Sequence, residues 1–320
     1  MGPDLSTGAE DSVEDAGPGG GSQPSDRRMA AGGGVGHVAT ATSLPRVRSP
    51  STTLGGIALL GVGLLAAARI AVNLPGSVVG ADLQRWYPLL HTAATVGPAA
   101  AAIGLGVVAD SAWRRVGLVA VGVFGLLATV SPGAALPATG VVVLGGWLGA
   151  LPPTIDGART AVSGRGIVAT ALLAGLSCSL VGSAGVAPPL LRPVGSVLSL
   201  AGVAVSPLSL STRPRTLDWT VGAIVAAGTL FAGTASPFVS GAVMLVVGGI
   251  VHVPFVLVVA AVGGAGITVS AALARGDGAG VTAGALLVVA GVPYTLPRAL
   301  GVVVAATIVV RPVATRSESA

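Results

Sequence analysis

The sequence predicts an all-α, polytopic transmembrane helix bundle. Of its 320 residues, 52% are apolar and only 9% are charged, and the apolar residues fall into long runs separated by short polar or proline-containing segments. A soluble globular domain carries about 25% charged residues. Because so little charge cannot cover a water-facing surface of this size, we expect most of the chain to lie in lipid.

Small residues dominate the apolar composition. Glycine accounts for 50 of the 320 residues, whereas aromatic residues make up only 3%. Lipid gives helices no hydrophobic drive to associate, so small residues favour association by letting helix backbones approach closely. We therefore expect many tightly packed helices rather than a wide cavity lined by aromatic side chains.

The first 50 residues differ from the rest of the chain. They contain six of the twelve acidic residues and Gly/Ser/Pro-rich sequence such as 17–22, and they show no repeating apolar face. Such a segment buries too little apolar surface to offset the entropy lost on ordering. We predict a disordered cytoplasmic tail over 1–50, a transmembrane domain over 51–312 and a short cytoplasmic tail over 313–320.

The apolar runs predict about ten membrane spans, within a range of eight to eleven. A spanning helix needs about 20 predominantly apolar residues. The runs cover residues 54–73, 88–108, 116–130, 136–151, 167–186, 194–210, 219–235, 238–273, 281–292 and 299–310. The run 238–273 is too long for one helix and short for two, so its number of crossings decides the sidedness of everything that follows it.

Arginine placement favours one net crossing for this long run. All 17 basic residues are arginine, and cytoplasmic loops carry an excess of basic residues. One crossing puts 13 arginines on the cytoplasmic side, 3 outside and 1 in the first span, whereas two crossings give 11 against 5. We therefore expect a cell-membrane protein with both termini in the cytoplasm, and an interfacial or re-entrant piece from Gly263 onward.

The chain offers few side chains for catalysis or metal binding. It has three histidines, one cysteine and no lysine, and it lacks metal-ligand spacings, a P-loop and a nucleophile elbow. Its arginines occur singly and in pairs rather than in the clustered patch of a nucleic-acid-binding protein. We expect no enzymatic activity, no cofactor and no nucleic-acid partner, and we expect the lipid bilayer and other membrane subunits as partners.

Three ionisable residues are candidates for a functional site, because charged groups are costly inside a membrane. His252 lies between a glycine pair and Pro254, where it either contacts a proton or substrate beside a helix break or is a neutral imidazole bonded to a backbone carbonyl. Arg298 lies between two short apolar runs, where it either caps an outer hairpin or reaches into the protein toward an anion. Arg69 lies one turn from the outer end of its run, and we expect it to extend to the membrane interface.

Three classes of function stay open. The scarcity of polar residues within the spans favours an accessory or scaffold membrane component without a catalytic site. About ten spans interrupted by glycine and proline also fit a transporter or permease subunit. A membrane enzyme acting on lipid substrates would need polar residues clustered at one face, and the sequence gives no sign of such a cluster.

Overall fold

The computed structural model describes residues 49–73, 80–247, 253–289 and 295–311. Nearly all of the predicted N-terminal tail, the predicted C-terminal tail and His252 lie outside the described residues, so what the sequence predicts about them stays a prediction. Within the described ranges, the regular elements are all helical. The predicted all-α class is confirmed.

The helices follow the predicted apolar runs closely. Each run coincides with one helix, except that 238–273 holds two, and the short α5 was not predicted. The elements are α1 (Pro50–Val72), α2 (Gly80–Val107), α3 (Ala112–Val130), η1 (Pro132–Ala134), α4 (Ala135–Ala150), α5 (Ile155–Val162), α6 (Gly164–Ser183), α7 (Pro188–Ala204), η2 (Ser206–Ser209), α8 (Thr216–Ala235), α9 (Pro237–Val247), α10 (Phe255–Ala274), α11 (Gly278–Val289) and α12 (Thr295–Val310).

The expected count of about ten spans is not confirmed. Among the described residues, six helices are long and apolar enough to cross a membrane, or seven if α4 and α5, which meet at 93°, form one broken span. Length is the reason, since the four other predicted runs correspond to α4, α7, α11 and α12, whose described residues number 16, 17, 12 and 16. At about 1.5 Å of rise per residue, none of these four by itself covers a hydrocarbon core of about 30 Å.

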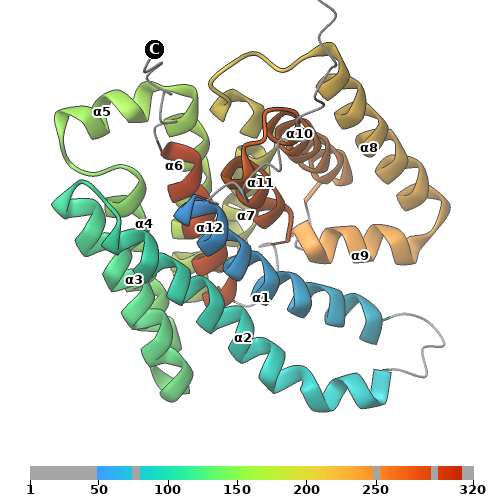
Figure 1. Cartoon of the computed structure of the whole chain (residues 1–320). Coiled ribbons are helices and arrows are strands. Elements are labelled where there is room, and N and C mark those ends of the chain that lie inside the picture. The colour runs from blue at the N-terminus through green and yellow to red at the C-terminus, as the bar shows by residue number, and fades with distance from the viewer. Residues whose placement is uncertain (1–48, 74–79, 248–252, 290–294, 312–320) are drawn as a thin grey trace, which may run out of the picture. The chain divides into compact units, whose positions relative to one another are not determined.

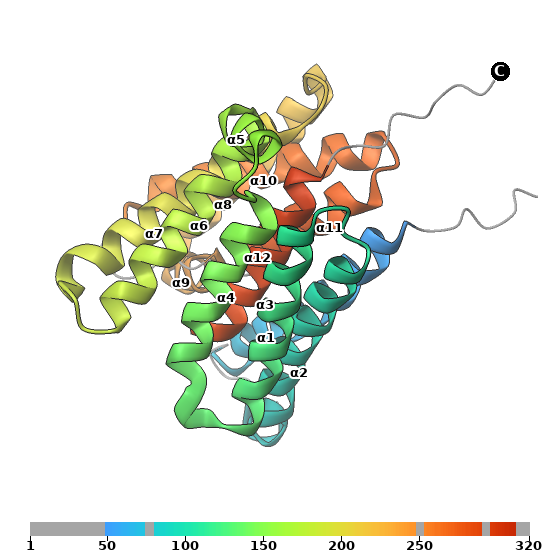
Figure 2. The same ribbon diagram turned by 90° about the vertical axis from the view of Figure 1, so that its left-hand side faces the viewer.

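Several helix ends meet at one end of the bundle. Arg165, at the start of α6, donates hydrogen bonds to the carbonyls of Ser209 and Arg311, both at 3.0 Å, and Arg275 donates to the carbonyl of Thr212 at 3.3 Å. Figure 2 shows α5 at this end and the α3–α4 turn at the other. We call it the arginine-rich end, because it carries Arg114, Arg115, Arg159, Arg165, Arg213, Arg215, Arg275 and Arg311.

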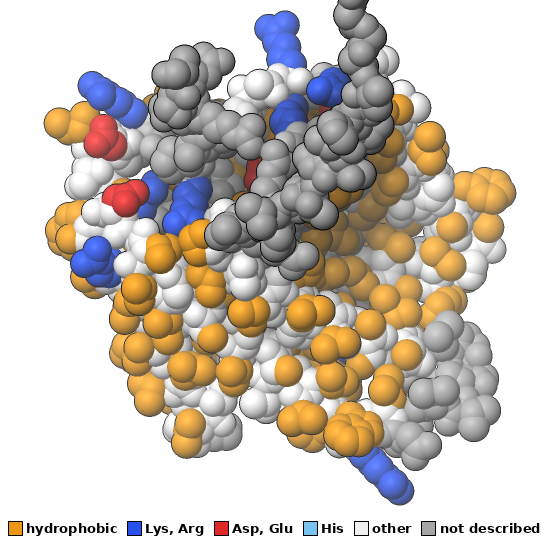
Figure 3. Space-filling model, in the orientation of Figure 1, with side chains coloured by type: hydrophobic (Ala, Val, Ile, Leu, Met, Phe, Trp, Pro, Cys, Tyr) orange, Lys and Arg blue, Asp and Glu red, His pale blue; other side chains and the backbone are white. Residues whose placement is uncertain are grey.

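The opposite end carries fewer charges. Arg85 and Arg192 lie near the starts of α2 and α7, and Arg69 lies near the end of α1. Figure 3 shows arginine and acidic side chains gathered over one end of the molecule and apolar side chains over most of the rest of that face. The two ends therefore differ in charge, and the end with more arginines is the one that the predicted topology assigns to the cytoplasm.

The expectation of an interfacial piece from Gly263 onward is wrong. Helix α10 runs unbroken through Gly263 and Gly264, and the interruption lies earlier, between α9 and α10. Pro254 is the N-cap of α10, where its missing N–H costs nothing. Gly264 instead serves packing, because a Cβ at this position would lie 2.2 Å from the carbonyl oxygen of Ala204 on α7. From the start of α8 to the end of α10, the chain leaves the arginine-rich end and returns to it.

Helix α12 is the centre of the bundle. It contacts α1, α2, α4, α6 and α11, and Figure 1 shows it surrounded by other helices. Nearly all its residues from Leu296 to Val310 are buried. Around it, neighbouring antiparallel helices pack through glycine: Gly117 of α3 meets Gly145 of α4, and Gly175 of α6 meets Gly195 of α7. The expected close packing through small residues is present in the described helices.

Candidate functional site

An open cleft lies at the opposite end of the bundle, between the last turns of α1 and the first half of α2. Its volume is about 660 Å³. Six of its eight lining residues have polar side chains, and the lining consists of Arg69, Val72, Asn73, Gln84, Tyr87, Pro88, His91 and Thr92. Arg69 and Asn73 are four residues apart on α1, as are Tyr87 and His91 on α2, so each pair lies on one face of its helix.

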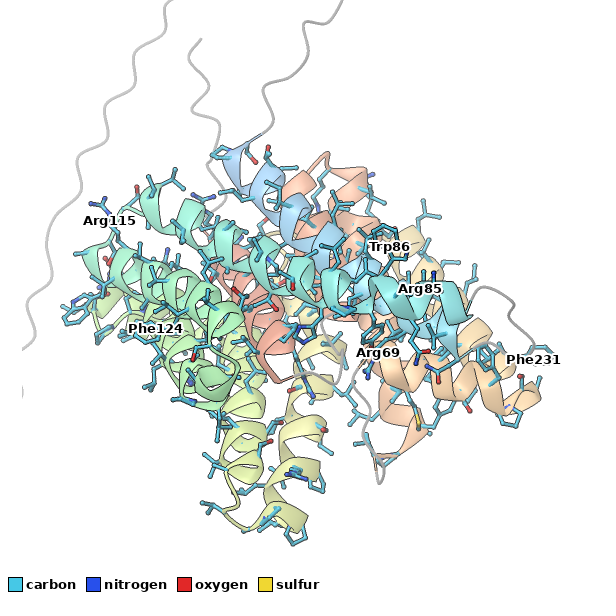
Figure 4. The ribbon with its side chains drawn as sticks, turned by 90° about the horizontal axis from the view of Figure 1, so that it is seen from below. Arg69, Arg85, Trp86, Arg115, Phe124 and Phe231 are labelled. Atoms are coloured by element: carbon cyan, nitrogen blue, oxygen red, sulfur yellow. The ribbon has the colours of Figure 1, made fainter. Side chains whose placement is uncertain are left out.

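Arg69 connects the two walls of this cleft. Its Nε donates a hydrogen bond to the hydroxyl of Tyr87, and its own carbonyl accepts one from Asn73 Nδ2 at 2.7 Å. Figure 4 shows Arg69 at this end together with Arg85 and Trp86 of α2. The sequence predicts that Arg69 extends to the membrane interface. That stays a prediction; in the structure Arg69 is partly buried, and its guanidinium donates to the hydroxyl of Tyr87 on α2.

The same arginine borders a second hollow. This adjoining groove has a volume of about 340 Å³ and is lined by Arg69, Ile70 and Asn73 of α1 and its end together with Pro237, Phe238, Gly241 and Ala242 of α9. Arg69 is therefore shared between a polar cleft on the α2 side and a more apolar groove on the α9 side.

A proline interrupts the backbone hydrogen bonding of α2 beside the cleft. Pro88 lies inside α2, and a proline has no N–H to donate to the carbonyl four residues earlier, here that of Gln84. The carbonyl of Pro88 itself accepts a hydrogen bond from Thr92 Oγ1 at 2.9 Å. The cleft thus combines one guanidinium with amide, imidazole and hydroxyl groups, and its lining residues include no carboxylate.

Arg298 lies deeper in the protein than Arg69. Its side chain is 7% exposed. It is twelve residues from Val310, the last residue of α12, which lies at the arginine-rich end. At about 1.5 Å per residue, that places Arg298 about 18 Å from this end, within the depth of a hydrocarbon core of about 30 Å. Arg298 is therefore buried, and whether it caps an outer hairpin or contacts an anion stays a prediction.

The described residues contain part of the predicted site and add to it. His252 lies outside them, so its role stays a prediction. Tyr87 and His91 line the cleft with Arg69. The matching four-residue spacings, of Arg69 with Asn73 and of Tyr87 with His91, were the one signal in the sequence that could have grouped these residues. In the part of the chain that the structure describes, no three His, Cys, Asp or Glu side chains come close enough to hold a metal ion.

Comparison with known proteins places the chain in a family. A family model described as an integral membrane family of unknown function, DUF8068, matches residues 51–310. No curated protein and no solved structure matches the chain. The matched region contains almost every described residue, including the long apolar helices and the cleft. The chain is therefore a multi-pass membrane protein that belongs to the integral membrane family DUF8068.

Proposed function

We propose that this membrane protein is a transporter or permease subunit that recognises an anionic solute through Arg298 and Arg69. The observation that carries the proposal is the burial of Arg298 on the central helix of the bundle. An arginine inside a membrane is costly and typically marks a substrate or ion pathway. A protein that served only as a packed scaffold would gain nothing from this residue that an apolar side chain could not supply.

A break between two apolar helices supports the same function. Between α9 and α10, the described residues Val253 and Pro254 are not helical. Backbone that is not helical at membrane depth is tolerated where protein or a water-filled cavity surrounds it. Transporters commonly build their substrate sites at such interrupted helices, near the middle of the membrane.

The cleft around Arg69 supplies the chemistry of an entrance. Arg69 offers guanidinium N–H groups, and Asn73, Gln84 and His91 bring amide and imidazole groups to the same space. Charge-assisted hydrogen bonds from a guanidinium favour carboxylates and phosphates over neutral molecules. An anion that entered here would approach the half of α12 that carries Arg298.

The proposal includes an orientation. Eight described arginines lie at the arginine-rich end, and positively charged loops face the cytoplasm. The described part of the chain begins at Ser49 and ends at Arg311, both at this end. The cleft would then face away from the cytoplasm, and both termini would be cytoplasmic.

One observation favours a second candidate function, an accessory or scaffold component without a catalytic site. Helix α8 packs on the rest of the bundle far less than the other long helices, with 11% of its apolar window buried. Its outward face carries Leu217, Ile224 and Phe231, the last of them 77% exposed. Such a face can bind another membrane subunit as well as lipid, and this was the function that the sequence alone favoured.

Ligand-induced stabilisation of the purified protein tests the first candidate. Its melting temperature in detergent would be measured with phosphate, sulfate, and small mono- and dicarboxylates against chloride at equal ionic strength. A ligand that binds the folded state raises stability in proportion to the logarithm of its concentration over Kd. We expect at least one anion to stabilise the wild type and not Arg298→Gln.

The matched control for this experiment is Arg85→Gln. Arg85 is exposed and borders neither hollow at the same end of the bundle, so its replacement should leave the stabilisation unchanged. Arg69→Gln serves as a second variant in case Arg298→Gln does not fold. Equal melting temperatures with every anion and with chloride would contradict the anion-transport proposal and favour the accessory role.

A further inference from the structure

A separate cavity lies at the arginine-rich end, away from the Arg69 cleft. Its volume is about 780 Å³, and it forms where α3, α5 and α6 begin and where α12 ends. Each of the three helices that begin there contributes one arginine to the wall, namely Arg114, Arg159 and Arg165. Guanidinium groups from three helices therefore share one hollow, which points to an anionic ligand.

Positive charge outweighs negative charge in this cavity. Two carboxylates, Asp110 and Asp156, line it beside the three arginines. Asp156 lies 3.9 Å from Arg159, and both side chains are largely exposed, so this pair holds neither residue firmly. The guanidinium of Arg165 donates to the carbonyls of Ser209 and Arg311, and these neutral acceptors do not cancel its charge.

Arg114 is the arginine best placed for an added ligand. Its Nε is buried, and it has no hydrogen-bond partner among the described residues. A buried donor without a partner costs about 1–3 kcal/mol unless something satisfies it. Arg114 also lies in the first turn of α3, whose N-cap, Ser111, makes no side-chain capping bond, so the partial positive charge of this helix end adds to that of the guanidinium.

Helix α5 places the cavity at the level of lipid headgroups. It turns by 93° from α4, so it runs across the direction of the spanning helices. Ile155 and Val162, seven residues apart on one face of α5, are 76% and 82% exposed. A short helix with an apolar outer face and charged neighbours is typical of one that lies in the membrane interface.

We infer that this cavity binds the phosphate of an anionic phospholipid headgroup. Arg114, Arg159 and Arg165 would hold the phosphate, and the exposed apolar face of α5 would lie beside the acyl chains. Basic pockets between membrane helices bind anionic headgroups in this way. The site shares no residue with the Arg69 cleft or with Arg298, so it stands independently of the proposed transport function.

The test uses the purified, delipidated full-length chain in a mild detergent. Native mass spectrometry would measure binding of phosphatidylglycerol and of phosphatidylcholine to the wild type, to Arg114→Gln and to Arg115→Gln. Arg115 is the matched control, because it carries the same charge one residue away, is exposed, and donates to the carbonyl of Ala109 outside the cavity.

We expect the wild type to bind one phosphatidylglycerol in preference to phosphatidylcholine. Loss of one arginine contact should weaken this binding about fivefold in Arg114→Gln and leave it unchanged in Arg115→Gln. If Arg114→Gln does not fold, Arg159→Gln replaces it, because Arg159 is exposed at the rim. The same weakening of phosphatidylglycerol binding is expected for this variant.

Three results would overturn the inference. Equal binding of the two lipids would show that the cavity does not select an anionic headgroup. Equal weakening by Arg114→Gln and Arg115→Gln would assign the preference to diffuse surface charge. Displacement of phosphatidylglycerol by millimolar inorganic phosphate at constant ionic strength, with stabilisation of the lipid-free protein, would assign the cavity to a soluble phosphate instead.

Discussion

Gly117 of α3 and Gly145 of α4 face each other so closely that a Cβ on either residue would lie 2.6 Å from the carbonyl oxygen of the other. Gly175 of α6 and Gly195 of α7 repeat this relationship, at 2.7 and 2.6 Å. In each pair a backbone carbonyl oxygen is among the obstructing atoms, and it cannot move aside as a flexible side chain can. Glycine is therefore required at these crossings for packing, and close approach replaces the hydrophobic drive that lipid does not supply.

Replacing Gly117 by alanine should destabilise the protein by about 1–3 kcal/mol, the usual cost of overpacking. The matched control is Gly63→Ala in α1, where an added Cβ would meet nothing within 4 Å. This control should be neutral or stabilising, because alanine favours the helix over glycine by up to about 1 kcal/mol. Thermal unfolding in detergent measures both, and an equal melting temperature for the two variants would contradict the packing account.

Asp218, in the first turn of α8, should contribute to the stability of the folded protein. Its side chain is 2% exposed, and its two oxygens accept hydrogen bonds from the backbone N–H of Arg215 at 2.8 Å and from Ser270 of α10 at 2.9 Å. Asp218→Ala removes the acceptor of both donors and should lower the melting temperature. Asp156→Ala, which removes an exposed carboxylate, should leave the melting temperature nearly unchanged. A loss of the same size in both variants would argue against a specific role for the buried contacts.

Cysteine labelling should place Ser236 and Gly276 on opposite sides of the membrane. Ser236 ends α8, and Gly276 follows α10, whose last residues meet the start of α8 at the arginine-rich end. In a Cys178→Ser background, a membrane-impermeant thiol reagent applied to whole cells should label a cysteine at position 236 and not one at 276. Labelling of both would mean that the chain between them crosses the membrane twice.

The positions of the helices were largely readable in the sequence because lipid demands continuous apolar runs. Helix α5 escaped prediction because it has only eight residues and a mixed composition, and its existence depends on Thr154 capping its start through the N–H of Gly157. The interruption within 238–273 was misplaced because glycine breaks helices in water. In this bundle Gly263 and Gly264 remain helical, since neighbouring backbones pack against them.

The candidate site was only partly readable for a related reason. Arg69 and Arg298 attract attention in the sequence because charged residues are conspicuous in apolar runs. Tyr87 and His91 are ordinary residues for a membrane interface, and nothing local distinguishes a residue that faces lipid from one that faces α1. Their grouping with Arg69 follows from how α1 packs on α2, which is a property of the fold rather than of either run.

Uptake by proteoliposomes tests most directly whether the protein moves an anionic solute past Arg298. The purified chain would be reconstituted and loaded with the anion that stabilises it most, and exchange of the radiolabelled anion would be followed in wild type, Arg298→Gln and Arg85→Gln. The transport proposal predicts exchange above that of protein-free vesicles for the wild type and Arg85→Gln, and its loss in folded Arg298→Gln. Exchange at the level of empty vesicles in all three, or undiminished exchange in Arg298→Gln, would contradict it.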